Sequence, residues 1–260
     1  MAEALLNEVS DRDFVNSLAR GLEVLRVFTR HKPKMTLSEV ANGTGTTRAT
    51  ARRLLLTLVR EGYVETDGKH FSLRPKLLEL GFSVLSSMDL WDVAQPIMNE
   101  LAHKLQESCF AAILDGDAVI YVARASSHRL VNVGIRVGSR VPAYCVSTGR
   151  VLLAGLPDAE LHRYLDSVKL EKFTANTTTS KVKLRSQVEE ARRQGWASVD
   201  QELEIGLRSL SVPIRGRGGD VIAALNVCCP SARITPEDMG SRILTELLAA
   251  SRDITHALQG

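Results

Sequence analysis

The sequence lacks the marks of a membrane-spanning or secreted protein. No apolar run among the 260 residues approaches the ~18 residues that a membrane helix needs. The first residues, MAEALLNEVSDRDF, are acidic and do not show the basic-then-apolar order of a signal peptide. We therefore expect a cytoplasmic protein that has no membrane partner.

Cysteine is scarce, and its spacing excludes the common metal motifs. The chain has only four cysteines, and none of them forms a CxxC pair. No histidine pattern accompanies them at zinc-ligand spacing. We expect reduced, buried thiols, no metal ion and no cofactor. The four residues are Cys109, Cys145, Cys228 and Cys229.

Signatures of an enzyme are also missing. Cys145, Ser147 and Thr148 could act as nucleophiles, but there is no GxSxG elbow and no Cys/His signature. The glycine-rich run 216–219 lies between two expected strands rather than before a helix, so it is no phosphate loop. His103, His128 and His162 lie in unrelated contexts. We expect no catalytic residue.

The charge is concentrated in one segment. Residues 14–74 carry 11 Lys and Arg against 5 Asp and Glu, while residues 75–260 carry 21 of each sign. Such a basic excess over about 60 residues suits a small module that contacts DNA phosphates. A solvated basic surface would show the same excess, so charge alone does not decide between the two.

The basic segment has the element order of a winged helix-turn-helix. Periodic leucines predict a helix over 17–30, and a capping box at Thr36 begins a short second helix. Gly43-Thr44-Gly45 predicts a tight break before a third helix, which Thr46 or Thr47 caps. Two alternating runs around Asp67-Gly68 then predict a β-hairpin.

The rest of the chain alternates strand-like and helical patterns, which predicts an α+β fold with an antiparallel sheet. We expect a DNA-binding domain over 14–74, a linker helix over 75–89 and an effector-binding domain over 90–260. Residues 129–137 have a strand-like pattern.

The third helix should read bases, because in a helix-turn-helix the second helix of the motif lies in the major groove. Arginine can pair with guanine, and threonine can bond a base or touch a thymine methyl. The hairpin tip would lie against the DNA backbone or minor groove. The expected DNA-binding residues are Thr46, Thr47, Arg48, Thr50, Arg52, Arg53, Lys69 and His70.

From Ser17 to about Leu258 the chain resembles the IclR family of bacterial transcriptional regulators. The resemblance rests on SLARGLEVL in the first helix, on the winged module, on PAYCVSTGRVLLA, and on GWASVDQELEIGLRSLSVPI. In the last stretch Glu202, Ser209, Leu210 and Ser211 match the family, whereas Val199 and Arg215 depart from it. Two of these runs resemble regulators of protocatechuate, 4-hydroxybenzoate and β-ketoadipate catabolism.

The resemblance implies several properties that the residues alone do not establish. The effector domain should have a GAF-like fold with flanking helices. The protein should form homodimers or homotetramers, held partly by the DNA-binding domains and linker helices. It should bind double-stranded DNA at a palindromic operator, under control of a small carboxylate. A keto acid of the glyoxylate or pyruvate type is an alternative to an aromatic acid.

The resemblance also implies a ligand pocket made from three segments. A free helix start at Thr148 would supply backbone N–H groups for a carboxylate, and neutral polar and apolar side chains would complete the cleft. The implied residues are Leu130, Tyr144, Ser147, Thr148, Asp200, Leu207, Ser209, Asn226 and Cys228.

Three charged residues near this pocket admit more than one interpretation. Arg208 alternates with Ser209 along a strand, so we expect it to face away from the ligand and to pair with Glu202 or Glu204. Arg136 could pair with a ligand carboxylate. Asp200 could contact the ligand or cap a loop.

Overall fold

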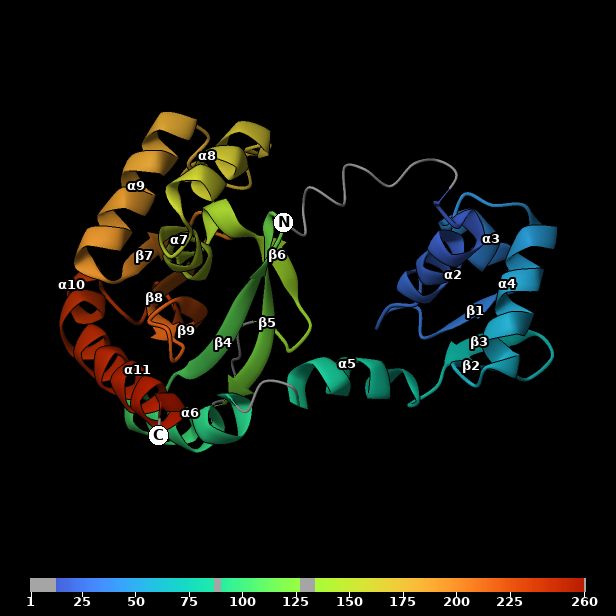
Figure 1. The fold of residues 1–260 in the computed structure, drawn as a ribbon, viewed down its shortest axis with the longest axis horizontal. Coiled ribbons are helices and arrows are strands. Elements are labelled where there is room, and N and C mark those ends of the chain that lie inside the picture. The colour runs from blue at the N-terminus through green and yellow to red at the C-terminus, as the bar shows by residue number, and fades with distance from the viewer. Residues whose placement is uncertain (1–12, 87–89, 127–133, 260) are drawn as a thin grey trace. The chain divides into compact units, whose positions relative to one another are not determined.

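The computed structural model describes residues 13–86, 90–126 and 134–259. The chain divides into two compact units, Met1–Ser87 and Met88–Gly260, which are described separately (Figure 1). No helix within the described ranges is long and apolar enough to cross a membrane. The expected domain limits 14–74, 75–89 and 90–260 remain predictions.

Three helices form the first unit's core. These are α2 (Asn16–Arg26), α3 (Leu37–Gly43) and α4 (Arg48–Arg60). The Thr36 hydroxyl accepts from the Glu39 amide, and the Glu39 carboxylate accepts from the Thr36 amide, as the capping box predicts. Gly45 has a φ of +61°, which allows the sharp turn between α3 and α4.

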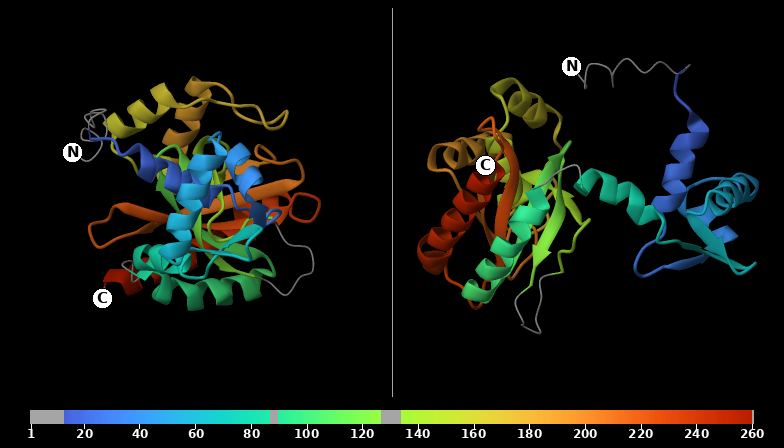
Figure 2. Two further views of the ribbon diagram at one scale, coloured as in Figure 1. Left: turned by 90° about the vertical axis from the view of Figure 1, so that its right-hand side faces the viewer. Right: turned by 60° about the horizontal axis from the view of Figure 1, so that its bottom comes forward.

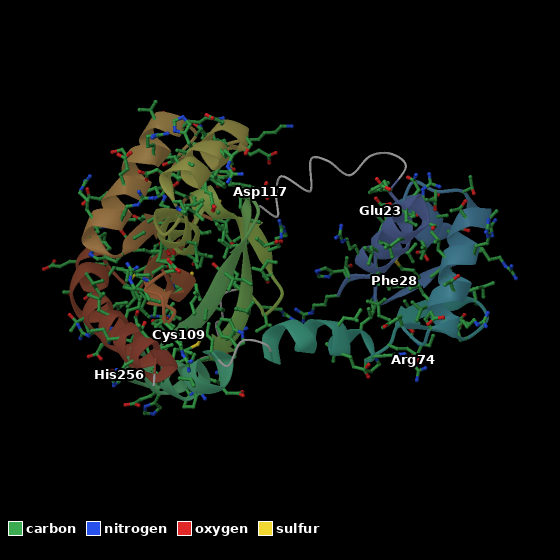
Figure 3. The ribbon with its side chains drawn as sticks, viewed as in Figure 1. Glu23, Phe28, Arg74, Cys109, Asp117 and His256 are labelled. Carbon is green, nitrogen blue, oxygen red and sulfur yellow. The ribbon has the colours of Figure 1, made fainter. Side chains whose placement is uncertain are left out.

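A small sheet completes the winged module. Strands β2 (Val64–Thr66) and β3 (His70–Leu73) form the expected hairpin. A third strand, β1 (Lys34–Thr36), pairs with β3 and was not expected from the sequence. Phe28, Val24 and Leu55 are buried between the helices and this sheet (Figure 3 labels Phe28).

Two helix limits differ from the expectation. Helix α2 ends at Arg26 rather than at residue 30, because Thr29 and Lys32 exchange backbone hydrogen bonds in a tight turn. The linker helix α5 (Leu77–Ser86) begins after Pro75 rather than at it.

A six-stranded antiparallel sheet forms the centre of the second unit, in the order β6-β5-β4-β9-β8-β7. The strands are β4 (Ser108–Asp115), β5 (Ala118–Ala125), β6 (Arg140–Pro142), β7 (Ala197–Asp200), β8 (Leu207–Arg215) and β9 (Val221–Pro230). The strand expected over 129–137 lies mostly outside the described residues, and residues 134–137 are not strand.

Helices cover both faces of this sheet (Figures 1 and 2). On one face lie α6 (Leu90–Leu105), which contains Pro96 without a break in the helix, and the C-terminal α11 (Leu244–Gln259), which contacts α6. A capped turn, α10 (Pro236–Asp238), and a π-helical segment, η2 (Met239–Ile243), lead into α11.

The other face holds the elements that build the candidate ligand site. A 3₁₀ turn, η1 (Ala143–Cys145), leads into α7 (Ser147–Ala154), and α8 (Asp158–Ser167) and α9 (Lys181–Gln194) follow. Each face has its own apolar core, and the buried apolar residues of the central strands β4, β9 and β8 belong to one core or the other. The α+β architecture expected from the sequence is therefore confirmed.

Candidate functional site

Threonine hydroxyls shape the start of α4. Thr47 is the N-cap residue, and its Oγ1 accepts from the Thr50 amide at 3.2 Å. The hydroxyls of Thr47 and Thr50 lie 3.0 Å apart, and Thr46 Oγ1 lies 2.8 Å from Thr44 Oγ1. These bonds hold the helix start in place, whichever groups contact DNA.

Three of the four arginines of α4 lie in its first two turns, with Arg48 and Arg52 one turn apart on one side of the helix. Arg48, Arg52 and Arg53 are all exposed, and no guanidinium among them forms an ion pair within the described residues. Arg53 and Thr50 line an apolar groove between α2 and α4, whereas Arg48 and Arg52 do not. The structure thus separates Arg53 from the other two arginines.

The wing tip is ordered by one carboxylate. Asp67 Oδ1 accepts from the amides of Lys69 at 2.9 Å and His70 at 2.7 Å. These amides, His70 first, lower the pKa of Asp67 to about 2. The side chain of Lys69 remains exposed.

Polar side chains from three elements meet between α7 and the sheet. The Ser147 hydroxyl, at the start of α7, donates to Ser209 Oγ at 2.9 Å and lies 2.8 Å from Ser211 Oγ. Asn226 Nδ2 on β9 donates to Ser211 Oγ at 3.0 Å and to Ser147 Oγ at 3.2 Å. We call Ser147, Ser209, Ser211 and Asn226 the polar cluster.

The polar cluster is buried inside an apolar layer. Ser147 and Ser211 are fully buried, and Asn226 is 1% exposed. The side-chain oxygen of Asn226, Oδ1, has no hydrogen-bond partner among the described residues. Buried polar groups usually have partners, so this acceptor is available to a further molecule.

Two more residues extend the cluster along the same face. Ser211 Oγ donates to Thr148 Oγ1 at 3.3 Å, and Thr148 Oγ1 lies 3.5 Å from the Tyr121 hydroxyl on β5. The Tyr121 ring contacts Phe110 edge to face, at 5.6 Å between centroids. Cys228 pairs with Ser209 across β8 and β9 and is buried on the same face.

Helix α7 begins inside this cluster without a side-chain cap. Its N-cap residue is Val146, which cannot accept from the first amides of the helix. The helix packs tightly on η1, since a Cβ at Gly149 would lie 2.0 Å from the carbonyl oxygen of Ala143. The free amides at this start favour an anion.

A buried ion pair fixes α7 from its middle. Arg150 Nη2 donates to both carboxylate oxygens of Glu202, at 2.7 and 2.8 Å, and both side chains are nearly inaccessible. The Thr178 amide donates to the same carboxylate, and the Thr177 hydroxyl donates to the Glu202 carbonyl. The pair therefore joins α7, the loop after β7 and the segment before α9.

The partner expected for Arg208, Glu202 or Glu204, was wrong. Arg208 binds both oxygens of Asp200 at 3.0 Å and also donates to the Ile234 carbonyl. Arg208 faces away from Ser209, as strand alternation predicts, but Glu202 is already occupied by Arg150 and takes no part. Asp200 lies on the Arg208 side of the sheet, away from the polar cluster.

The other described residues that were expected to bind the ligand do not bond to the polar cluster. Tyr144 donates its hydroxyl proton to the Glu171 carbonyl, accepts from the Glu171 amide and stacks on Phe173. Leu207 packs into the apolar core on the cluster's face. Arg136 is exposed in a turn, and Leu130 lies outside the described residues.

Sequence reasoning missed Tyr121, Ser211 and the Arg150–Glu202 pair. Ser211 could have been found, because it is two residues from Ser209 on one strand and so shares its face. Tyr121 could not, because a register shift at Ala111/Ala112 changes the pairing of β5 with β4.

The cysteine side chains are unsuited to act as nucleophiles at neutral pH. All four are buried and free. Burial raises the pKa of both Cys145 and Cys228 to about 12. A thiolate is needed for nucleophilic attack, so neither thiol is activated.

Comparison with known proteins agrees with this geometry. The model of the IclR helix-turn-helix domain matches residues 17–68, and that of the IclR C-terminal domain of bacterial transcriptional regulators matches residues 82–256. The Pca regulon regulatory protein of Pseudomonas putida is 44% identical over 96% of this chain and 86% of its own length.

Solved structures show the same architecture. A transcriptional regulator of Rhodococcus sp. RHA1 is 48% identical, with a TM-score of 0.84 over 94% of this chain and 98% of that one. An IclR homologue of Microbacterium hydrocarbonoxydans in complex with 4-hydroxybenzoate is 26% identical, with a TM-score of 0.82 over 94% and 99%. On the strength of both domain matches and this geometry, the chain belongs to the IclR family of bacterial transcriptional regulators.

Proposed function

We propose that this protein binds a palindromic operator through α4 and the β2–β3 wing, and that a small aromatic carboxylate binding at the start of α7 changes its operator affinity. The observation that carries the effector half is the polar cluster, with its buried unpartnered acceptor beside an uncapped helix start. Two relatives support an aromatic acid: the Pca regulon regulatory protein of Pseudomonas putida and the homologue in complex with 4-hydroxybenzoate.

The site chemistry suits such a ligand. A carboxylate would accept from the free amides of α7 and from Thr148 or Ser147. Tyr121 and Phe110 supply the aromatic wall against which a ring can pack. The acid is bound and released unchanged, since the nearby thiols have a raised pKa and the Ser147 hydroxyl bonds other hydroxyls rather than a histidine base.

The apolar groove on the first unit supports a homodimer. The groove has a volume of 790 Å³, and leucines of α2, α4 and α5 line it. Leu18, Leu22 and Leu80 are each about half exposed or more, at 63%, 47% and 54%. We assign this face to a second copy of the chain, because a two-fold dimer matches two operator half-sites.

Calorimetric titration of the full-length protein with 4-hydroxybenzoate, protocatechuate and β-ketoadipate tests the effector site. We expect saturable binding of one of these acids and its loss in Ser147→Val, which removes the central hydroxyl of the cluster. Ser167→Ala on α8 is the control, because its hydroxyl bonds only the carbonyls of Arg163 and Tyr164. Binding of pyruvate or glyoxylate instead would replace the aromatic acid with a keto acid.

A further inference from the structure

The threonines at the start of α4 use part of their hydrogen-bonding capacity within the module. Thr44 donates its hydroxyl proton to the Val40 carbonyl at 2.9 Å, so the 2.8 Å contact with Thr46 uses the Thr46 proton. Thr47 accepts from the Thr50 amide, and the hydroxyls of Thr47 and Thr50 bond each other. A hydroxyl has one proton and two acceptor sites, so the Thr46 proton is engaged, whereas the Thr47–Thr50 pair uses one of its two protons.

The exposed residue beside Arg48 and Arg52 is apolar. Ala49 is the second residue of α4 and is exposed, as are Arg48 before it and Arg52 one turn later. Successive helical residues are rotated by about 100°. Ala49 therefore projects away from Ala51 and Leu55, which are fully buried in the core of the module.

We propose that the Ala49 methyl group contacts the C5-methyl group of a thymine and so selects thymine at one position in each operator half-site. This inference rests on the proposed function, since it requires α4 to lie in the major groove. Among the four bases only thymine presents a methyl group there, and alanine is one of the side chains that matches it. Next to adenine or cytosine the same methyl would cover an amino group without offering a partner.

The position of Ala49 makes this contact specific to one base. Arg48 and Arg52 both lie on one side of it around the helix, about 100° and 60° away, and each can pair with a guanine. The first turn of a reading helix approaches the base edges most closely, and the Thr47 cap holds that turn rigidly. In this arrangement the two arginines contact polar base edges, and Ala49 contacts a methyl group.

Thymine-to-uracil replacement in the operator tests the inference, because uracil lacks only the C5-methyl group. The full-length protein is first footprinted on the DNA upstream of its own gene. Each thymine in the protected half-sites is then replaced by deoxyuracil, one symmetric pair at a time, and affinity is measured by fluorescence anisotropy. Wild type should lose roughly fourfold per half-site at one pair, as expected for one buried methyl group.

The variant Ala49→Gly should bind the thymine and uracil operators with equal affinity at that pair. Ala159→Gly is the matched control, since Ala159 is also the exposed second residue of a helix, α8, but lies in the other unit. It should keep the full uracil penalty. Ala49→Ser, which retains helix stability better than glycine, should show a reduced penalty.

Two results would overturn the inference: no thymine replacement affects wild type, or the uracil penalty is undiminished in Ala49→Gly. Failure of wild type to bind the upstream DNA at all is a different result, which would remove the proposed function and this contact with it. Thermal unfolding of Ala49→Gly separates a lost contact from a lost fold.

Discussion

Arg150 and Glu202, 52 residues apart in the sequence, form a buried ion pair that joins the middle of α7 to the loop after β7. Arg150 lies one helical turn after Ser147, which begins the helix. Ser147 bonds the other three members of the polar cluster. The pair therefore links this loop to the helix whose first residues we assign to the effector.

Removing one member of this pair should be strongly destabilising. Arg150→Met leaves the Glu202 carboxylate buried without its cation, which typically costs about 3–5 kcal/mol. Arg193→Met is the control, because the Arg193–Glu190 pair is exposed and contributes about 0–1 kcal/mol. Equal melting temperatures for the two variants would show that the Arg150 pair is not structural.

Arginine variants of α4 should separate DNA binding from folding. Arg48→Ala and Arg52→Ala should each weaken operator binding by about 5- to 150-fold, if each arginine pairs with one guanine. Arg60→Ala, at the last turn of the same helix, should have a much smaller effect. Circular dichroism and effector titration should be unchanged, and undiminished operator affinity in the Arg48/Arg52 double variant would contradict the assignment of α4 to the major groove.

The dimer assignment can be tested on α2. Leu22→Glu places a charge in the apolar groove and should shift the protein toward monomers in light scattering. Its operator affinity should fall with it, because one half-site alone remains bound. Val182→Glu, at a fully separate exposed apolar position on α9, is the control. An unchanged oligomeric state for Leu22→Glu would place the interface elsewhere.

The wing carboxylate should titrate far below its ordinary range. Two backbone amides stabilise ionised Asp67, which lowers its pKa from 3.8 to about 2. The stabilisation of the turn is thus fully present above pH ~4 and is lost as the pH falls from there through about 2. Carboxyl ¹³C NMR should give a midpoint near 2, and a midpoint near 3.8 would mean that the turn does not hold the carboxylate.

The four cysteines should resist alkylation in the native protein. Burial raises the pKa of Cys145 and Cys228 to about 12, so almost no thiolate is present at pH 7.5. Mass spectrometry after iodoacetamide treatment should show no native labelling and four labels after denaturation. Rapid native labelling of Cys145 would reveal an activated thiol and revive an enzymatic interpretation.

Local chemistry explains what the sequence could predict. The capping box at Thr36 and Glu39 involves residues three apart, and the wing hairpin follows from Asp67 and Gly68. Alternation along β8 placed Arg208 and Ser209 on opposite faces without any knowledge of the rest of the sheet. Features of this kind depend on neighbours in the chain.

Long-range pairing explains what the sequence could not predict. The partner of Arg208 depends on the strand register, which sets Asp200 opposite it. Glu202 pairs instead with Arg150 of α7, an arginine that its sequence neighbours do not mark as buried. Tyr121 joins the polar cluster only after the register shift in β4. The strand expected at residues 134–137 was wrong, although its pattern alternates suitably.

Operator binding with and without effector tests the central claim most directly. Fluorescence anisotropy would measure binding of the purified protein to its own upstream DNA at several salt concentrations, alone and with 4-hydroxybenzoate, protocatechuate or β-ketoadipate. The account predicts tight binding with a steep salt dependence, and a shift in affinity with one acid that Ser147→Val abolishes. Absence of DNA binding, or binding that none of these acids alters, would contradict it.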